Sequence, residues 1–202
     1  IQLLSLHDSA CGEELLGANP TPLFSLTLRQ AGSKKEVRLV ADDGWRRTAL
    51  RPTRDGVEAR WLDPTDESLA GITVIAAARA DRRNHAWHWK FRVENSSADW
   101  SVWRVVFPQL SLADLGTNSA VLFPRGPGEV QVNVSRRAFK FSGKYPDGWC
   151  SMQFMAAYRD AEIPTGLYVA VHDPWGSTKE IVLESDTNTC SAQMRFDHPA
   201  AD

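Results

Sequence analysis

Eight tryptophans occur among the 202 residues of this chain, and three of them lie in or beside turn sequences. These three are Trp45, Trp149 and Trp175. A large indole ring in a turn is difficult to explain by core packing, whereas an exposed ring can stack on the apolar face of a pyranose sugar. We therefore treat the three positions as candidates for contact with a sugar or with another domain.

Residues 173–176 have the sequence Asp-Pro-Trp-Gly and follow His172, which ends an apolar stretch. Asp in the first position, Pro in the second and Gly in the fourth are typical of a type I turn. His172 could act there as an acid, a base or a ligand contact, or it could only hold the turn. With Arg125, which also lies near a turn, the candidate ligand-binding residues are Trp149, Trp175, His172, Arg125 and Asp173.

The other tryptophans fit a packing role. Trp87 and Trp89 are in phase with Phe91 and Val93, so the four side chains share one face of a predicted strand. We expect this face, together with Trp103, to fill the core, because each ring removes much apolar area from water.

No residue pattern identifies a catalytic centre, a metal site or a cofactor. His85 and His88 are three residues apart, which places them on opposite faces of a strand and makes them poor joint metal ligands. Cys11, Cys150 and Cys190 are far apart and odd in number, so buried free thiols are favoured over a disulfide framework, although one bridge is compatible. The chain has no phosphate loop, Cys-x-x-Cys, calcium loop or Gly-x-Ser-x-Gly elbow.

The charge and the apolar content of the chain argue against a nucleic-acid-binding protein and against a membrane-spanning helix. The 23 basic and 25 acidic residues give a net charge of −2, which argues against a nucleic-acid partner because such proteins carry a basic surface. Apolar residues make up 43% and charged residues 24% of the chain, as in ordinary globular proteins. No stretch of uncharged apolar residues is long enough to predict a membrane-spanning helix.

Alternation of polar and apolar residues runs along nearly the whole chain, with turn signals spaced roughly every ten residues, as in sandwiches and barrels. It predicts on the order of fourteen strands and an all-β fold, a large antiparallel supersandwich of two sheets, with short helices only around 66–69 and 112–115. We expect a single domain at 1–197 and the start of a linker at 198–202, where the alternation is lost.

Two segments resemble a known family. Residues 145–158 have the sequence YPDGWCSMQFMAAY, and residues 165–176 have the sequence TGLYVAVHDPWG, followed by Lys179. This pattern resembles the N-terminal β-supersandwich of large multidomain glycoside hydrolases of the endo-α-N-acetylgalactosaminidase type. That domain is similar in fold to galactose mutarotase and precedes a (β/α)8 barrel. Residues 91–97 and 106–110 are compatible with the same pattern.

The resemblance implies a role beside an active site that lies elsewhere. In the family the catalytic carboxylates belong to the barrel, so this segment is expected to be non-catalytic, to pack against the barrel and to frame its substrate. The implied partners are that barrel and, through the parent protein, a carbohydrate. Galactose mutarotases use histidines and a glutamate base on this fold. His85 and His172 are present, but no motif around a glutamate matches.

Two alternatives remain open, an independent carbohydrate-binding module and a mutarotase- or epimerase-like sugar enzyme. Because the chain begins at Ile1 without an initiator methionine or signal peptide, we expect it to be part of a longer polypeptide. The N-terminus leaves the compartment open, and we favour a periplasmic or secreted location over the cytoplasm. A domain that packs on a barrel should expose an apolar patch on one face.

Overall fold

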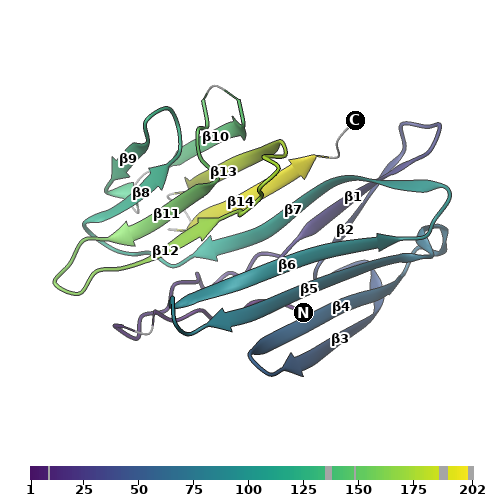
Figure 1. Ribbon diagram of the computed structural model, residues 1–202, viewed down its shortest axis with the longest axis horizontal. Helices are drawn as coiled ribbons and strands as arrows, with labels where there is room; N and C mark the ends of the chain where they lie inside the picture. The colour runs from purple at the N-terminus through teal and green to yellow at the C-terminus, as the bar shows by residue number, and fades with distance from the viewer. Residues whose placement is uncertain (9, 135–137, 148, 187–190, 200–202) are drawn as a thin grey trace. The chain divides into compact units, whose positions relative to one another are not determined.

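The computed structural model describes residues 1–8, 10–134, 138–147, 149–186 and 191–199. Fourteen strands and one short 3-10 helix are present in this part of the chain. All strand pairs with a determined register are antiparallel, and the strands form three sheets (Figure 1). The prediction of an all-β, antiparallel sandwich protein is therefore confirmed.

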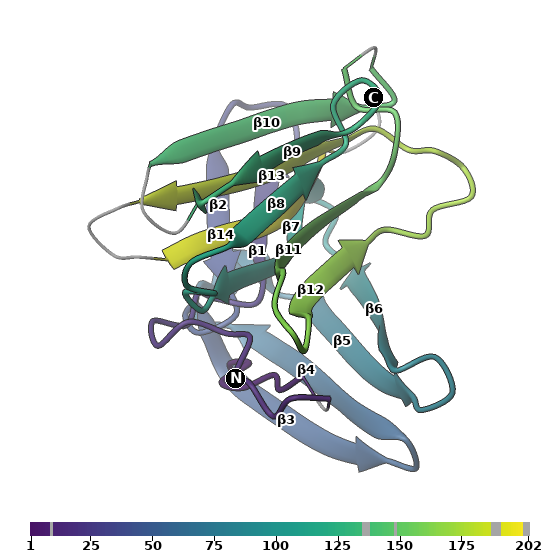
Figure 2. The ribbon, with the colours of Figure 1, turned by 90° about the vertical axis from the view of Figure 1, so that its left-hand side faces the viewer.

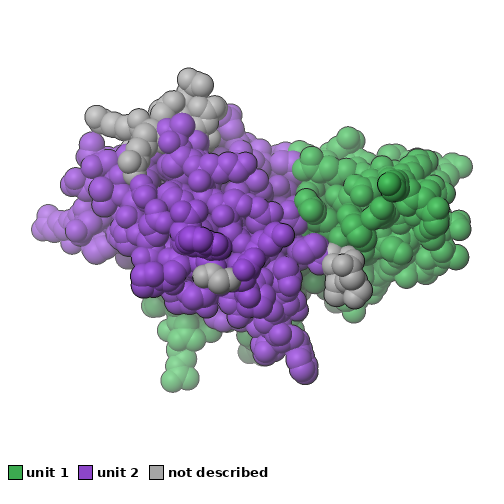
Figure 3. Space-filling view, turned by 90° about the horizontal axis from the view of Figure 1, so that it is seen from above, with its two compact units in different colours: residues 1, 24–105 green, residues 2–23, 106–202 purple. Residues whose placement is uncertain are grey.

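The chain divides into two compact units, which are coloured separately in Figure 3. Unit 1 contains residue 1 and residues 24–105, and unit 2 contains residues 2–23 and 106–202. Strand β7 (Trp100–Leu112) runs from the first unit into the second. The expectation of one domain at 1–197 stays a prediction.

Unit 1 is built from a four-stranded meander and a hairpin. The meander has the strand order β3-β4-β5-β6, and the hairpin pairs β1 with β2. Asp66 caps the 3-10 helix through a hydrogen bond from the Ser68 N–H, which agrees with the short helix predicted at 66–69. The elements are β1 (Ser25–Gln30), β2 (Glu36–Val40), β3 (Trp45–Thr53), β4 (Gly56–Pro64), η1 (Glu67–Leu69), β5 (Ile72–Asp81) and β6 (Ala86–Asn95).

Trp61 is the centre of the core of unit 1. Its side chain is fully buried, and its ring meets that of Phe24 edge to face with centroids 4.8 Å apart. The indole N–H donates to the Ala41 carbonyl at 2.7 Å, so the polar atom of the ring is satisfied inside the core. Phe91 of β6 completes the aromatic group at 5.2 Å from Phe24.

The core placement predicted for Trp87 is wrong. Trp87 is 50% exposed, whereas Trp89 and Phe91, two and four residues further along β6, are partly buried. Trp87 is the second residue of β6 and lies beside the exposed turn at 82–85, so fewer side chains are available there to cover an indole. Trp103 is half-buried, with the guanidinium of Arg29 4.4 Å above its ring.

Unit 2 contains the other strands, which form two layers (Figures 1 and 2). One sheet has the order β12-β11-β8-β9, and the other places β10, β13 and β14 beside β7. The strands are β8 (Ser119–Phe123), β9 (Glu129–Val132), β10 (Phe139–Tyr145), β11 (Phe154–Arg159), β12 (Thr165–Ala170), β13 (Lys179–Asp186) and β14 (Ser191–Pro199).

Both sheets of unit 2 contribute to one hydrophobic core. Phe123 and Met155 enter it from the first sheet, and Leu183 and Phe196 enter it from the second. All four are almost completely buried. Because two sheets share this core, unit 2 is a sandwich.

One local expectation, the short helix at 112–115, is corrected in unit 2. No helix forms at 112–115, because the Ala113 N–H bonds to the Leu15 carbonyl and Leu112 pairs with Leu16, which keeps this segment extended. Strand β14 continues to Pro199, two residues into the predicted linker; the imidazole of His198 bonds to the backbone of Phe107. Residues 200–202 lie outside the described part of the chain.

Trp61→Ala should lower the free energy of unfolding by about 3–5 kcal/mol, because it removes a fully buried ring and leaves a cavity. The measurement is urea unfolding followed by circular dichroism. Trp87→Ala is the matched control and should cost less than about 1 kcal/mol, since half of that ring is already in water. Equal losses in the two variants would contradict this description of the core.

Candidate functional site

The five candidate ligand-binding residues all belong to unit 2 and come from three loops. Arg125 lies in the β8–β9 loop and Trp149 in the β10–β11 loop. His172, Asp173 and Trp175 lie in the β12–β13 loop.

The β8–β9 and β10–β11 loops are joined through their backbones. Arg125 and Cys150 form an isolated β-bridge, and the Gly126 N–H donates to the Trp149 carbonyl at 2.7 Å. The Ser151 N–H also donates to the Pro124 carbonyl at 3.1 Å. Arg125 and Trp149, which are 24 residues apart in the sequence, therefore lie on neighbouring segments.

Gln153 joins the β10–β11 loop to the β12–β13 loop. Its backbone carbonyl accepts from the Val171 N–H at 2.8 Å, and its side-chain amide donates to the Asp173 carbonyl at 3.1 Å. Residues 124–128, 149–153 and 171–178 therefore form one hydrogen-bonded group, which we call the loop cluster. The structure brings the three loops of all five predicted residues into this cluster.

Asp173 organises the turn that carries Trp175. Its two carboxylate oxygens accept the N–H groups of Trp175 at 2.9 Å and Ser177 at 2.7 Å. The Gly176 N–H donates to the Asp173 carbonyl at 3.3 Å, as a turn at 173–176 requires. Asp173 is a predicted ligand contact, and in the structure each of its carboxylate oxygens accepts a hydrogen bond from the turn that follows it.

Lys179 is a fully buried lysine at the start of β13. Its ammonium lies 3.2 Å from the Asp173 carboxylate and donates to the Gln153 side-chain oxygen at 2.7 Å and to the Ser177 carbonyl. The centre of the Tyr145 ring lies 4.8 Å from the ammonium, which is attracted to the negative face of the ring. A buried charge is tolerated only with partners of this kind, so the ammonium ties the loop cluster together.

Hydrogen bonds keep the Asp173 carboxyl ionised at neutral pH. Burial raises the pKa of the Asp173 carboxyl, but hydrogen bonds from Trp175, Ser177 and Lys179 outweigh burial and lower it to about 2. Burial lowers the pKa of His198, and the Lys179 charge lowers it further. The neighbouring Asp173 carboxylate and the Phe107 backbone act in the opposite direction on His198, and the net direction is downward.

The indole rings of the loop cluster face solvent. Trp175 is 90% exposed and Trp149 is 68% exposed, although the backbone beneath each is fixed by hydrogen bonds. His172 is exposed as well. Arg125 is half-buried, 3.5 Å from Glu129 and 5.9 Å from the Phe141 ring. Such an arrangement suits ring stacking and hydrogen bonding at a surface.

Trp45, the third turn tryptophan, belongs to unit 1 and is half-buried. Its indole N–H donates to the Val40 carbonyl at 2.9 Å, and its ring lies at the edge of the Trp61 core, 6.4 Å from Phe24. His85 also belongs to unit 1, where it lies in a turn and has a φ of 50°. Neither residue is part of the loop cluster.

Sequence analysis missed the roles of Lys179 and Gln153. The burial of Lys179 could have been predicted, because side chains two residues apart on a strand share one face. Lys179 therefore lies on the same face as Ile181 and Leu183, which point into the core. Gln153 carried no comparable signal, since its partners come from a distant loop.

The described residues contain no group of three or more His, Cys, Asp or Glu side chains that could hold a metal ion. Cys11 and Cys150 are free thiols, and burial raises the pKa of Cys150. Cys190 lies outside the described residues. Within the described ranges no helix is long and apolar enough to cross a membrane. A scan against known protein families finds none that matches the chain, and no curated protein matches it.

Asp173→Asn should lower the free energy of unfolding by about 3 kcal/mol, because it leaves the buried ammonium of Lys179 without its counter-charge. Urea unfolding at pH 7 measures the loss. Asp160→Asn, at an exposed aspartate of the same unit, is the matched control and should change the value by less than about 0.5 kcal/mol.

The same variant carries a pH signature. Asp173 titrates near 2 in the folded chain and near 3.9 when unfolded, so its contribution is complete above about pH 4 and is lost as pH falls toward 2. The difference in stability between wild type and Asp173→Asn should therefore shrink across that window. A difference that stays constant from pH 5 to about 2 would exclude this role for the Asp173 charge.

Proposed function

We propose that this chain is a non-catalytic β-sandwich domain of a carbohydrate-active glycoside hydrolase, which packs against the catalytic barrel and frames its substrate. The observation that carries the proposal is the outer face of the sheet β12-β11-β8-β9 (Figure 2). A sheet with one face on a core normally turns polar residues toward water on the other face. This sheet does not follow that rule.

The strand register assigns each residue of this sheet to one of its two faces. Val121, Met155 and Ala157 belong to the core, so the residues that alternate with them point outward. None of the outward residues carries a charge. We call this set the apolar sheet face: Phe154, Ala156 and Tyr158 of β11, Gly166, Tyr168 and Ala170 of β12, Ala120 and Leu122 of β8, and Val130 and Val132 of β9.

Several large side chains of the apolar sheet face are exposed. Tyr168 and Val132 are each 59% exposed, and Val130 and Tyr158 are exposed as well. The rings of Tyr168 and Phe154 pack together with centroids 5.2 Å apart, which holds both rings in fixed positions. A contiguous apolar surface of this kind marks an interaction site, and tyrosine is among the residues that contribute most to interfaces.

Position in the sequence favours a barrel as the occupant. All the aromatic side chains of this face belong to β11 and β12, and they lie within the two segments, 145–158 and 165–176, that resemble the glycoside hydrolase domain. The loop cluster follows the ends of β8 and β12 and precedes β11, so it borders the same sheet. A barrel has its active site in loops at one end, and a domain docked beside it can add Trp175 to the sugar-binding surface.

The test begins with the gene, which should encode alternating strands and helices of a barrel after the codon for Asp202. With the barrel and this chain produced separately, Tyr168→Glu should weaken their association at least about ten-fold in titration calorimetry, because it places a charge in an apolar interface. Leu50→Glu, at an exposed leucine of unit 1, is the control and should leave the affinity unchanged. A gene without a barrel, or equal effects of both variants, would overturn the proposal.

A second function, that of an independent carbohydrate-binding module, is favoured by one observation. Trp175 presents nearly its whole indole to solvent from a turn that is fixed by Asp173 and Lys179. Because the backbone of this turn is already fixed, it loses little conformational freedom when a sugar stacks on the ring.

If the module acts alone, the chain should bind soluble oligosaccharides, and Trp175→Ala should weaken binding about five- to ten-fold, since a stacked ring contributes roughly 1 kcal/mol or more. Tryptophan fluorescence during titration provides the measurement. Trp87→Ala removes an exposed ring of unit 1 and should have no effect. Loss of binding in both variants, or in neither, would contradict a module that relies on Trp175.

A further inference from the structure

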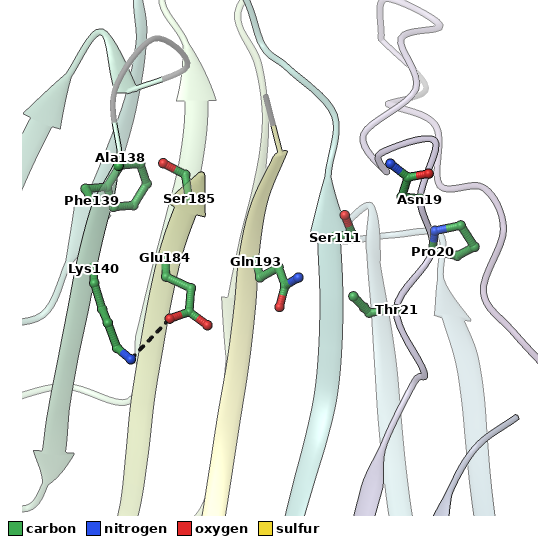
Figure 4. Close-up of a pocket in the computed structure, with 10 residues that line it drawn as sticks. All are labelled: Asn19, Pro20, Thr21, Ser111, Ala138, Phe139, Lys140, Glu184, Ser185 and Gln193. Carbon is green, nitrogen blue, oxygen red and sulfur yellow. Dashed lines mark ion pairs between the residues drawn. The ribbon is translucent and has the colours of Figure 1, made fainter. Parts of the chain in front are cut away.

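Unit 2 contains a groove at the end of β10 and β13 opposite to the loop cluster. Its volume is about 750 Å³, which is within the usual range for small-ligand sites of roughly 300–1,000 Å³. Figure 4 shows the side chains that line it, which come from three neighbouring strands, from β7 and from the segment at 19–21. The loop cluster and the apolar sheet face contribute none of them.

The floor of the groove is a row of polar side chains across the sheet. Lys140, Glu184 and Gln193 are register partners on β10, β13 and β14 (Figure 4). Their neighbours Leu183 and Met194 belong to the core, so this row lies on the face of the sheet that points away from the core.

Glu184 is the charged centre of this row. It accepts a hydrogen bond from Arg195 and lies 3.4 Å from the Lys140 ammonium. Burial raises the pKa of this carboxyl, but Arg195 and Lys140 outweigh burial and lower it, so the group is ionised at neutral pH. Because both cations already face a carboxylate, an anion such as phosphate would have to compete with Glu184 for them.

Neutral hydrogen-bonding groups surround the carboxylate. The side-chain amides of Asn19 and Gln193 make no hydrogen bond to another described residue, and Ser111 adds a hydroxyl. An amide offers both donors and an acceptor, and a carboxylate accepts from two neighbouring hydroxyls. Phe139 lies at the edge of the groove, and its ring packs on Phe141 and on the core of unit 2.

We propose that this groove binds a neutral oligosaccharide of two or three sugar units, with vicinal hydroxyls on Glu184 and the amides of Gln193 and Asn19. Polar groups that both donate and accept, with no free cation among those described, match the chemistry of a polyol rather than that of an anion. The site does not depend on docking to a barrel, because it uses neither Tyr168 nor Trp175.

The test uses the whole chain with maltotriose, cellotriose and β-1,4-galactotriose as probes, in saturation-transfer NMR and calorimetry. At least one trisaccharide should bind with a dissociation constant in the millimolar range or tighter. Gln193→Ala and Asn19→Ala should each weaken that binding about five-fold, the usual effect of one lost hydrogen bond. Gln131→Ala, at an amide on β9, and Trp175→Ala should leave it unchanged, and urea unfolding checks that every variant is folded.

Three results would overturn the proposal. The first is the absence of binding by all three probes at millimolar concentration. The second is binding that Trp175→Ala abolishes and Gln193→Ala does not change, which would place the sugar on the loop cluster. The third is displacement of the sugar by an equal concentration of inorganic phosphate, which would make the groove an anion site. The association assay with Tyr168→Glu is independent of all three, so the two proposals succeed or fail separately.

Discussion

A charge that cannot reach water determines how one end of unit 2 is built. The Lys179 ammonium is completely buried, and inside a protein such a group needs acceptors on every side that its hydrogens face. Those acceptors come from Gln153, Asp173 and Ser177, which lie in two different loops. Lys179, the first residue of β13, therefore fixes the positions of the β10–β11 and β12–β13 loops. The backbone that carries the exposed rings of Trp149 and Trp175 is fixed as a result.

In the four-stranded sheet β12-β11-β8-β9, both faces are apolar, although only one of them packs on the core of unit 2. One set of residues alternates into the core, as a two-layer sandwich requires. The other set is also apolar, which is the pattern of a sheet covered on both sides. This composition is the observation behind our proposal that another domain packs on the outer face of the sheet.

Much of the fold could be predicted, because strand periodicity depends on residues that are adjacent in sequence. The sequence Asp-Pro-Trp-Gly at 173–176 predicted its turn for the same reason, since the turn is closed by Asp173 and its near neighbours. The link between Gln153 and Asp173 spans 20 residues and could not be predicted from local pattern. The helix predicted at 112–115 was wrong for a similar reason, because the segment pairs with the distant Leu15. The prediction for Trp87 was wrong because alternation assigns a residue to a face of the strand but does not say how far the core extends along that face.

Unit 2 is built from two stretches of sequence that lie on either side of unit 1, and this arrangement affects the order in which the units can fold during synthesis. Residues 2–23 are synthesised before unit 1 but belong to unit 2, where Thr165 donates to Asp8 across 157 positions and Arg159 pairs with Glu13 across 146. Apart from residue 1, unit 1 is one continuous stretch, and it can form while the ribosome is still translating the later strands. Residues 15–17 can pair with β7 as soon as that strand has been made. The contacts of Asp8 and Glu13 form only after β11 and β12 emerge, so unit 2 is completed later than unit 1.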